Sequence, residues 1–135
     1  MSMRLRLFFD EDLNEPVKLQ EEESGQRDEV IHTMLYEGSQ VDETTLYLGQ
    51  TYTGDKIIEY QDITLEADPD LDDIEWVTLE YKLPDGTFSK NVSPSDGQYN
   101  EPIAIQRRVT IDTITEPVTT LNIHNLTYDM EEVLE

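Results

Sequence analysis

The stretch that decides the fold is VTLEYKL, residues 77–83. Apolar side chains stand at every second position from Val77 to Leu83, and polar residues fill the positions between them. In an extended chain alternate side chains point to opposite faces, so this pattern predicts a β-strand with one buried face. Residues 84–86, Pro-Asp-Gly, favour a turn, because proline presets φ and glycine tolerates positive φ. We therefore expect a hairpin in which residues 87–92 return as the partner strand.

Short extended patterns of the same kind recur along the chain, separated by turn residues. Residues 103–111 alternate cleanly except at Arg107, and in residues 57–65 the apolar row changes parity near Gln61 and Asp62, which predicts a β-bulge. No long row of apolar residues at helical spacing interrupts these patterns, so we predict an all-β fold, a sandwich or a barrel. The expected single domain spans residues 1–135, with further strands at 3–9, 30–36, 44–48 and 118–128.

The two ends of the chain differ in character. In the N-terminal strand, residues 3–9, alternate apolar residues from Leu5 to Phe9 share one face, so Arg6 is expected on the opposite, exposed face. Residues 129–135 are dominated by acidic side chains and are expected to form an acidic C-terminal tail.

Charge limits the partners that the chain can take. Nine Lys and Arg residues against 31 Asp and Glu residues give a formal net charge of −22. Nucleic acid is therefore a poor partner, and an anionic membrane surface is disfavoured by the same repulsion. A basic protein patch or bound cations would suit the chain better. Because self-repulsion destabilises a compact state at low salt, a salt-rich, halophilic habitat is a serious hypothesis.

The sequence contains no cysteine and no stretch of about 20 apolar residues that could span a membrane. Disulfides and cysteine-ligated metals are therefore not expected, and any metal site would need oxygen ligands. The first residues reach an acidic position too early for a secretory signal. We expect a soluble chain without a targeting segment.

The sharpest local cluster of polar residues is acidic. Asp68, Asp70, Asp72 and Asp73 stand close together, and carboxylates at alternate positions can converge on calcium. An EF-hand is excluded, because Asp73 occupies the position of the invariant glycine and Leu79 that of the bidentate glutamate. A loop-type calcium site remains one hypothesis, and a solvated acidic turn between two strands is the favoured one.

No motif for catalysis is present. His32 and His124 are the only histidines, and each lies within a strand pattern whose neighbours already explain it. The chain has no glycine-rich phosphate loop, nucleophile elbow or zinc-binding helix motif. We therefore expect a protein that is not an enzyme and that needs no cofactor.

Two arginines and the single tryptophan are candidate interface residues. Arg107 stands in an apolar row, so it either pairs with a buried acidic group or anchors a neighbouring subunit together with Arg108. Trp76 lies opposite the apolar face of residues 77–83. It either fills the second side of a central strand or serves as an exposed interface anchor.

A series of short segments follows in a characteristic order: LYL (46–48), GDK (54–56), YQDITL (60–65), EWV (75–77), PDGT (84–87) and RRV (107–109). Over residues 30–128 this order resembles immunoglobulin-like and fibronectin-like domains of tailed-virus particles. In those domains a short strand, a turn and an Ile-x-Leu strand precede a tryptophan-bearing hairpin. The chain departs from antibody-type domains in having no cysteine pair around Trp76, which leaves the strand topology open.

The resemblance implies an immunoglobulin-like antiparallel β-sandwich of about seven to eight strands. It further implies a structural protein of the virion, assembled in the host cytoplasm, that decorates the capsid or belongs to the tail. Its partners would then be other virion proteins in a multi-copy assembly, and the resemblance carries no catalytic residues.

Two other functions are compatible with the composition. An acidic protein can mimic DNA and occupy the basic groove of a nucleic-acid-binding enzyme, which requires carboxylates gathered on one elongated face. A calcium-dependent adhesion module would use the aspartates at 68, 70, 72 and 73.

Overall fold

The computed structural model describes residues 5–18, 28–32, 40–51, 56–67, 76–112, 118–121 and 124–133. These residues form β-strands and no helix, which confirms the all-β prediction, and so none of them belongs to a helix that could cross a bilayer. The strands are β1 (Leu5–Phe8), β2 (Glu29–His32), β3 (Gln40–Gln50), β4 (Ile57–Ala67), β5 (Val77–Lys82), β6 (Asn91–Val92), β7 (Ile103–Ile111), β8 (Val118–Leu121) and β9 (His124–Val133).

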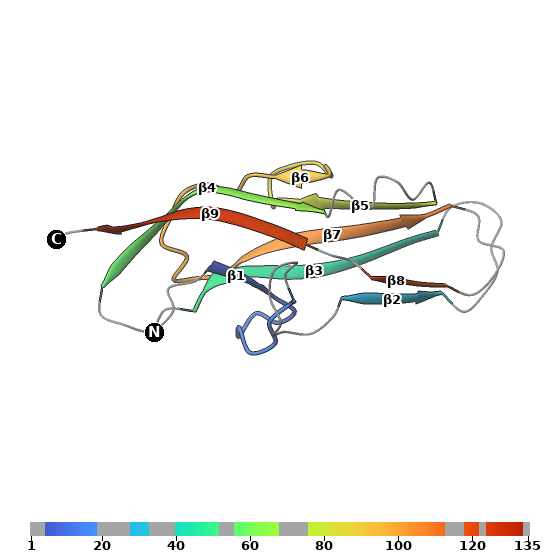
Figure 1. Ribbon diagram of the computed structural model, residues 1–135, viewed down its shortest axis with the longest axis horizontal. Helices are drawn as coiled ribbons and strands as arrows, with labels where there is room; N and C mark the ends of the chain where they lie inside the picture. Colours follow the sequence, from blue (N-terminus) through green and yellow to red (C-terminus); the bar gives the residue numbers. More distant parts are fainter. Residues whose placement is uncertain are drawn as a thin grey trace.

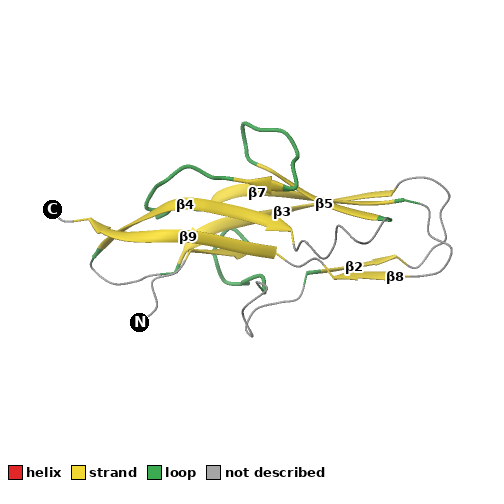
Figure 2. Cartoon of the chain, turned by 45° about the horizontal axis from the view of Figure 1, so that its top comes forward, coloured by secondary structure: helices red, strands yellow, loops and turns green. Residues whose placement is uncertain are grey.

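All strand pairs in the described chain are antiparallel. One sheet has the order β1-β3-β7-β5, a second has the order β6-β4-β9, and β2 pairs with β8 in a two-stranded sheet. Figures 1 and 2 show β4 and β9 running side by side and reaching beyond the ends of β3 and β7. The β2–β8 pair lies at the opposite end of the molecule.

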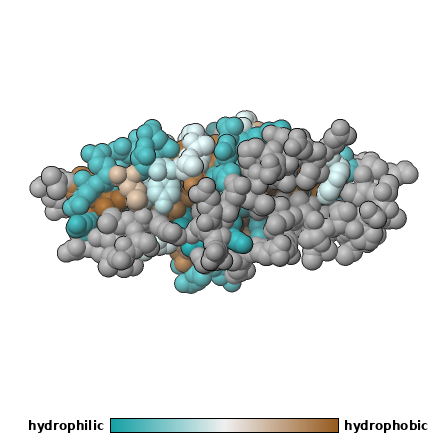
Figure 3. Space-filling view, in the orientation of Figure 1, coloured by the Kyte–Doolittle hydropathy of each residue, from teal (hydrophilic) through white to brown (hydrophobic). Residues whose placement is uncertain are grey.

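One hydrophobic core joins the two larger sheets. Alternate residues of β5 and β7 are buried, and so are alternate residues of β4. The arrangement is that of a β-sandwich, in which the inner faces of two sheets share a core. On the face drawn in Figure 3 the described surface is mostly hydrophilic. The most deeply buried apolar side chains come from both sheets: Leu46, Leu48, Tyr60, Ile63, Leu65, Tyr81, Ile105 and Val109.

The predicted β-bulge in β4 is confirmed. The register between β4 and β9 shifts between Gln61 and Thr64, and Asp62 has a φ of 51°. The backbone N–H of Asp62 donates to Oδ1 of Asp96 at 3.2 Å. Because the bulge adds one residue to β4, Tyr60 before it and Ile63 after it both point into the core.

The expected hairpin after β5 forms only in part. The turn is present, with the Gly86 N–H donating to the carbonyl oxygen of Leu83 at 3.0 Å. The returning chain pairs with β5 at one bridge, between Tyr81 and Ser89, and β6 then pairs with β4. The prediction of a full partner strand over residues 87–92 was wrong, because Val92 enters the core beside Leu65 of β4.

Both ends of the described chain differ from the sequence prediction. All residues of β1 are buried, including Arg6, because the following segment folds back over the strand and Val17 N–H donates to the carbonyl oxygen of Leu7 at 2.9 Å. Arg6 Nη2 donates to the carbonyl oxygen of Val17 at 3.4 Å. At the other end, the acidic residues expected as a tail continue β9 as far as Val133 and pair with the first half of β4.

Candidate functional site

Arg107 lies at the centre of a buried polar network between the sheets. It stands at an inward position of β7, and only 2% of the residue is exposed. Its Nη1 is 3.0 Å from Oδ1 of Asp28, and its Nη2 is 3.8 Å from Oδ2 of Asp42. Arg107 therefore makes the intrachain ion pair with a buried acidic group, which was one of the two roles predicted from the sequence. It is not an exposed anchor for a neighbouring subunit, because the guanidinium is enclosed by the core.

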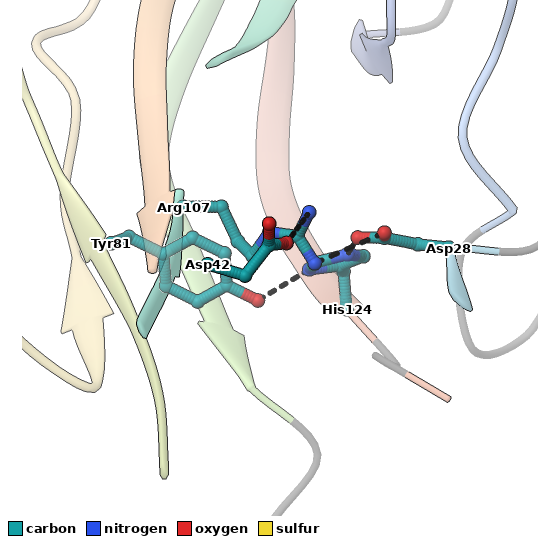
Figure 4. Close-up of polar contacts among 5 residues, drawn as sticks. All are labelled: Asp28, Asp42, Tyr81, Arg107 and His124. Atoms are coloured by element: carbon teal, nitrogen blue, oxygen red, sulfur yellow. Dashed lines mark hydrogen bonds and ion pairs between the residues drawn. The ribbon is translucent and has the colours of Figure 1, made fainter. Parts of the chain in front are cut away.

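Asp28 also contacts the fully buried His124 of β9. The Nε2 of His124 is 2.7 Å from Oδ2 of Asp28, and its Nδ1 is 2.5 Å from the hydroxyl oxygen of Tyr81. Figure 4 shows these side chains as a row that runs from Tyr81 to Asp28, with His124, Arg107 and Asp42 between them. The row connects β3, β5, β7 and β9 with the residue that precedes β2.

The protonation state of Tyr81 determines which atoms in this row donate hydrogen bonds and which accept them. Burial raises the pKa of the Tyr81 hydroxyl well above its usual value of 10.0, and the nearby Asp28 carboxylate raises it further, while Arg107 opposes the shift. Tyr81 is therefore a neutral donor to Nδ1 of His124. Nε2 of the same ring must then carry the hydrogen that is donated to Asp28.

A tyrosine, a histidine and an aspartate in this order can pass protons in an enzyme. Here Tyr81 and His124 are 0% exposed and Asp28 is 5% exposed. The row therefore cannot touch a substrate in this conformation. What it can do is fix the relative position of the two sheets, because Tyr81 and Asp28 provide hydrogen-bond partners for both nitrogens of the buried His124 ring.

Arg108 points to the other side of β7. Its Nη2 is 3.0 Å from Oε1 of Glu80, and its guanidinium carbon lies 3.9 Å from the centre of the Phe88 ring. The side chain is 30% exposed, so part of it faces solvent. Its role as an interface residue stays a prediction, with Glu80 and Phe88 holding it in place.

The remaining predicted site residues divide into two groups. Trp76 directly precedes β5, is half-buried and packs against the core, and its carbonyl oxygen accepts a hydrogen bond from Asp112 N–H at 2.9 Å. This position fits the core-filling alternative for Trp76. Residues 68, 70, 72 and 73 lie outside the described residues, so calcium binding there stays a prediction. The described residues contain no group of three or more His, Asp or Glu that could hold a metal.

The outer face of the β4–β9 pair carries opposed carboxylates. Glu59 and Glu131 are direct cross-strand partners. Nε2 of Gln61 donates to Oε1 of Glu59 at 3.2 Å and to Oε2 of Glu131 at 2.9 Å. The amide thus bridges two like charges that would otherwise repel each other across the strands.

The edge of β9 opposite β4 has no strand partner among the described residues. Asp129, Met130, Glu131 and Glu132 of this strand are exposed. Met130 is one of the two large apolar side chains found exposed in the described chain, at 50%. An open edge presents backbone N–H and C=O groups that another strand can pair with.

Of the five residues in the buried network, the sequence singled out only Arg107 as a possible partner of a buried acidic group. Residues 20–28 are polar and predict an exposed loop, so nothing local marks Asp28, the last of them, as the buried residue that it is. Tyr81 was assigned to the core, but its hydroxyl requires a hydrogen-bonding partner there. That requirement, together with Arg107 in an apolar row and a histidine in a strand, was the available signal for a buried polar network.

Comparisons with protein-family models, curated proteins and solved structures found no match to this chain.

Proposed function

We propose that this chain is a non-enzymatic structural subunit of a virus particle, in the capsid decoration or the tail, that acts through contacts with other proteins. The observation that carries the proposal is the open edge of β9, the ten-residue strand that reaches beyond the sandwich. A long strand with one unpaired edge is a template for a strand from another chain.

The strand order supports an immunoglobulin-like topology as part of the proposal. In that fold one sheet has the order A-B-E-D and the other C-F-G. The order β1-β3-β7-β5 corresponds to the first, and the pair β4-β9 corresponds to C and F. The open edge of β9 then lies where strand G would pair. A strand donated by a neighbouring subunit would complete the sheet.

Charge on β9 selects the kind of partner. Asp129, Glu131 and Glu132 are exposed along this strand, and the chain as a whole has a net charge of −22. Two β9 edges from copies of this chain would bring like charges together, which disfavours pairing between copies. The proposed partner is therefore a different virion protein, with lysine or arginine in the strand that it donates.

The buried network supports a role without catalysis. The only described side chains in the order of a proton relay, Tyr81, His124 and Asp28, are enclosed in the core. Their arrangement stabilises one relative position of the sheets. A subunit that must present a fixed strand edge to its neighbours benefits from that rigidity.

Site-directed cross-linking tests this proposal, because the chain contains no native cysteine. Thr127→Cys places a thiol at an exposed position of β9, and Gln106→Cys places one at an exposed position of β7 as the matched control. Particles would be purified from cells that produce each variant and treated with a short bifunctional thiol-to-amine reagent.

We expect the protein to cosediment with particles and Thr127→Cys to cross-link to one other virion protein, while Gln106→Cys does not. Failure to cosediment would refute the structural role. Cosedimentation with equal cross-linking at both positions would refute the β9 edge as the contact.

A further inference from the structure

A groove of about 730 Å³ lies between the turn after β5 and the loop that leads into β7. The turn contributes Leu83 and Asp85, and the loop contributes residues from Pro94 to Ile103. This volume falls within the range of about 300 to 1,000 Å³ that is usual for ligand sites in proteins. The groove shares no lining residue with β9.

The lining of the groove combines apolar and acidic side chains. Leu83, Tyr99 and Ile103 are half-buried and pack against the core, and Pro94 is buried. These side chains offer an apolar floor for one apolar group of a ligand.

Carboxylates surround this floor. Asp85, Asp96 and Glu101 are exposed lining residues, and none of the described lining residues is basic. Oδ1 of Asp96 accepts a hydrogen bond from the backbone of Asp62 at the bulge, which holds this carboxylate in place. An apolar floor with an acidic rim matches an apolar side chain flanked by lysine or arginine.

The wall of the groove is held by contacts within the chain. Gly97 exchanges two backbone hydrogen bonds with Tyr60 of β4, at 2.8 Å and 3.0 Å. The Tyr99 hydroxyl donates to the carbonyl oxygen of Ser95, and its ring packs edge-on against Tyr60 with centroids 6.4 Å apart. A preformed site loses little entropy on binding.

The backbone at Tyr99 is strained in this wall. Its φ is 54°, in the left-handed region that bulky residues rarely adopt. Such strain costs about 1–3 kcal/mol and gathers at binding sites and ligand clamps. The loop thus holds the aromatic ring against the groove in a conformation that the isolated sequence would not favour.

We propose that this groove binds an extended, basic segment of another protein, with an apolar side chain on the floor and lysine or arginine at the rim. The choice of a basic protein segment rests on charge complementarity with three carboxylates and on the net charge of the chain. The site does not depend on strand pairing at β9, so it can bind its ligand even if that proposal fails.

Fluorescence anisotropy with a short fluorescein-labelled peptide of alternating leucine and lysine tests the proposal. A peptide with glutamate in place of lysine is the control ligand. The double variant Asp85→Asn, Glu101→Gln removes two rim charges. The double variant Asp12→Asn, Glu11→Gln removes two charges from the exposed turn after β1, away from both the groove and β9, and is the matched control for net charge.

We expect the lysine peptide to bind and the glutamate peptide not to bind. At about 0.1 M salt, the rim variant should bind roughly 3- to 10-fold more weakly and the control variant at Glu11 and Asp12 within about twofold of the natural protein. Leu83→Ser, with its fold checked by circular dichroism, should weaken binding by roughly tenfold through the loss of apolar area.

Several results would overturn the proposal. One is the absence of binding at millimolar peptide, and another is equal weakening by both double variants, which would indicate non-specific attraction to an acidic surface. A third is self-association of the protein that the rim variant abolishes while peptide binding stays unchanged, because the occupant would then be a second copy.

Discussion

The carboxylate of Asp28 is shared by two buried groups, the guanidinium of Arg107 and the imidazole of His124. The guanidinium of Arg107 is buried, and a buried charge needs an opposite charge beside it. His124 in turn uses Tyr81 to satisfy its other nitrogen. At the residue scale the network therefore depends on Asp28, since no other described carboxylate contacts both partners.

Asp28→Asn is expected to lower the free energy of unfolding by about 3–5 kcal/mol, because it leaves the charge of Arg107 buried without a full partner. Urea denaturation measures this loss. Glu80→Gln is the control, since it weakens the partly exposed pair with Arg108 and should cost less than about 1 kcal/mol. Equal losses in the two variants would contradict a special role for Asp28.

The raised pKa of Tyr81 makes the free energy of unfolding depend on pH in alkali. Its pKa in the folded chain lies well above the ordinary value of 10.0, so above pH 10 the unfolded chain loses this proton and the folded chain keeps it. The free energy of unfolding that Tyr81 contributes is therefore complete below pH 10. It falls as the pH rises above 10, by up to about 1.4 kcal/mol per pH unit. Tyr60 acts in the same direction, because burial and the neighbouring Tyr128 raise its pKa to about 12.

Tyr81→Phe should therefore reduce the slope of stability against pH above pH 10, while lowering stability at neutral pH by about 1–3 kcal/mol through the unsatisfied Nδ1 of His124. Chemical denaturation across this pH range measures both effects. An unchanged alkaline slope in the variant would show that Tyr81 titrates normally.

At the scale of elements, β4 and β9 form a long antiparallel pair whose inner face packs into the core and whose outer face carries acidic side chains. The bulge at Asp62 lets β4 turn Tyr60 and Ile63 inward, and the outer face brings Glu59 opposite Glu131. The pair gains hydrogen bonds along its length, and it also brings together two like charges that the Gln61 amide bridges.

Glu131→Gln is expected to raise stability by roughly 0.2–1 kcal/mol at low salt, because it removes the repulsion across the strands. The gain should shrink at molar salt as screening increases. Thermal unfolding at two salt concentrations measures it, with Glu132→Gln, which breaks the exposed pair with Lys56, as the control. A loss of stability in Glu131→Gln at low salt would contradict this reading of the outer face.

Hydrophobic periodicity predicted those strands whose buried face shows as an alternation within their own sequence. The strand at residues 103–111 was found at its predicted bounds, and the bulge followed from the change of parity near Gln61. Residues 87–92 were assigned to the wrong sheet, because the pairing of Val92 with Leu65 of β4 depends on a strand far away in sequence and leaves no local signal. The polar network escaped prediction for the same reason, since Asp28 and Arg107 are far apart in sequence.

At the scale of the whole molecule, a core shared by the two larger sheets lies beneath a strongly anionic exterior. The net charge of −22 opposes compaction, and the buried ion pairs and apolar core must offset it. The same charge sets the kind of partner that each exposed surface can accept.

Stability should rise with salt, because the screening length falls from about 10 Å at 0.1 M to about 3 Å at 1 M. A melting curve in potassium chloride measures the effect, and sodium and magnesium chloride at equal ionic strength separate screening from specific cation binding. Little gain between low and molar salt would count against the halophilic habitat hypothesis.

Hydrogen exchange of the β9 amides, in the free protein and in purified particles, tests most directly whether β9 is an edge that accepts a strand. In the free protein we expect alternation, with amides that face β4 exchanging slowly and those on the opposite edge exchanging fast, and in the particle we expect slow exchange at both sets. Protection of both sets in the free chain, or no added protection in the particle, would contradict it.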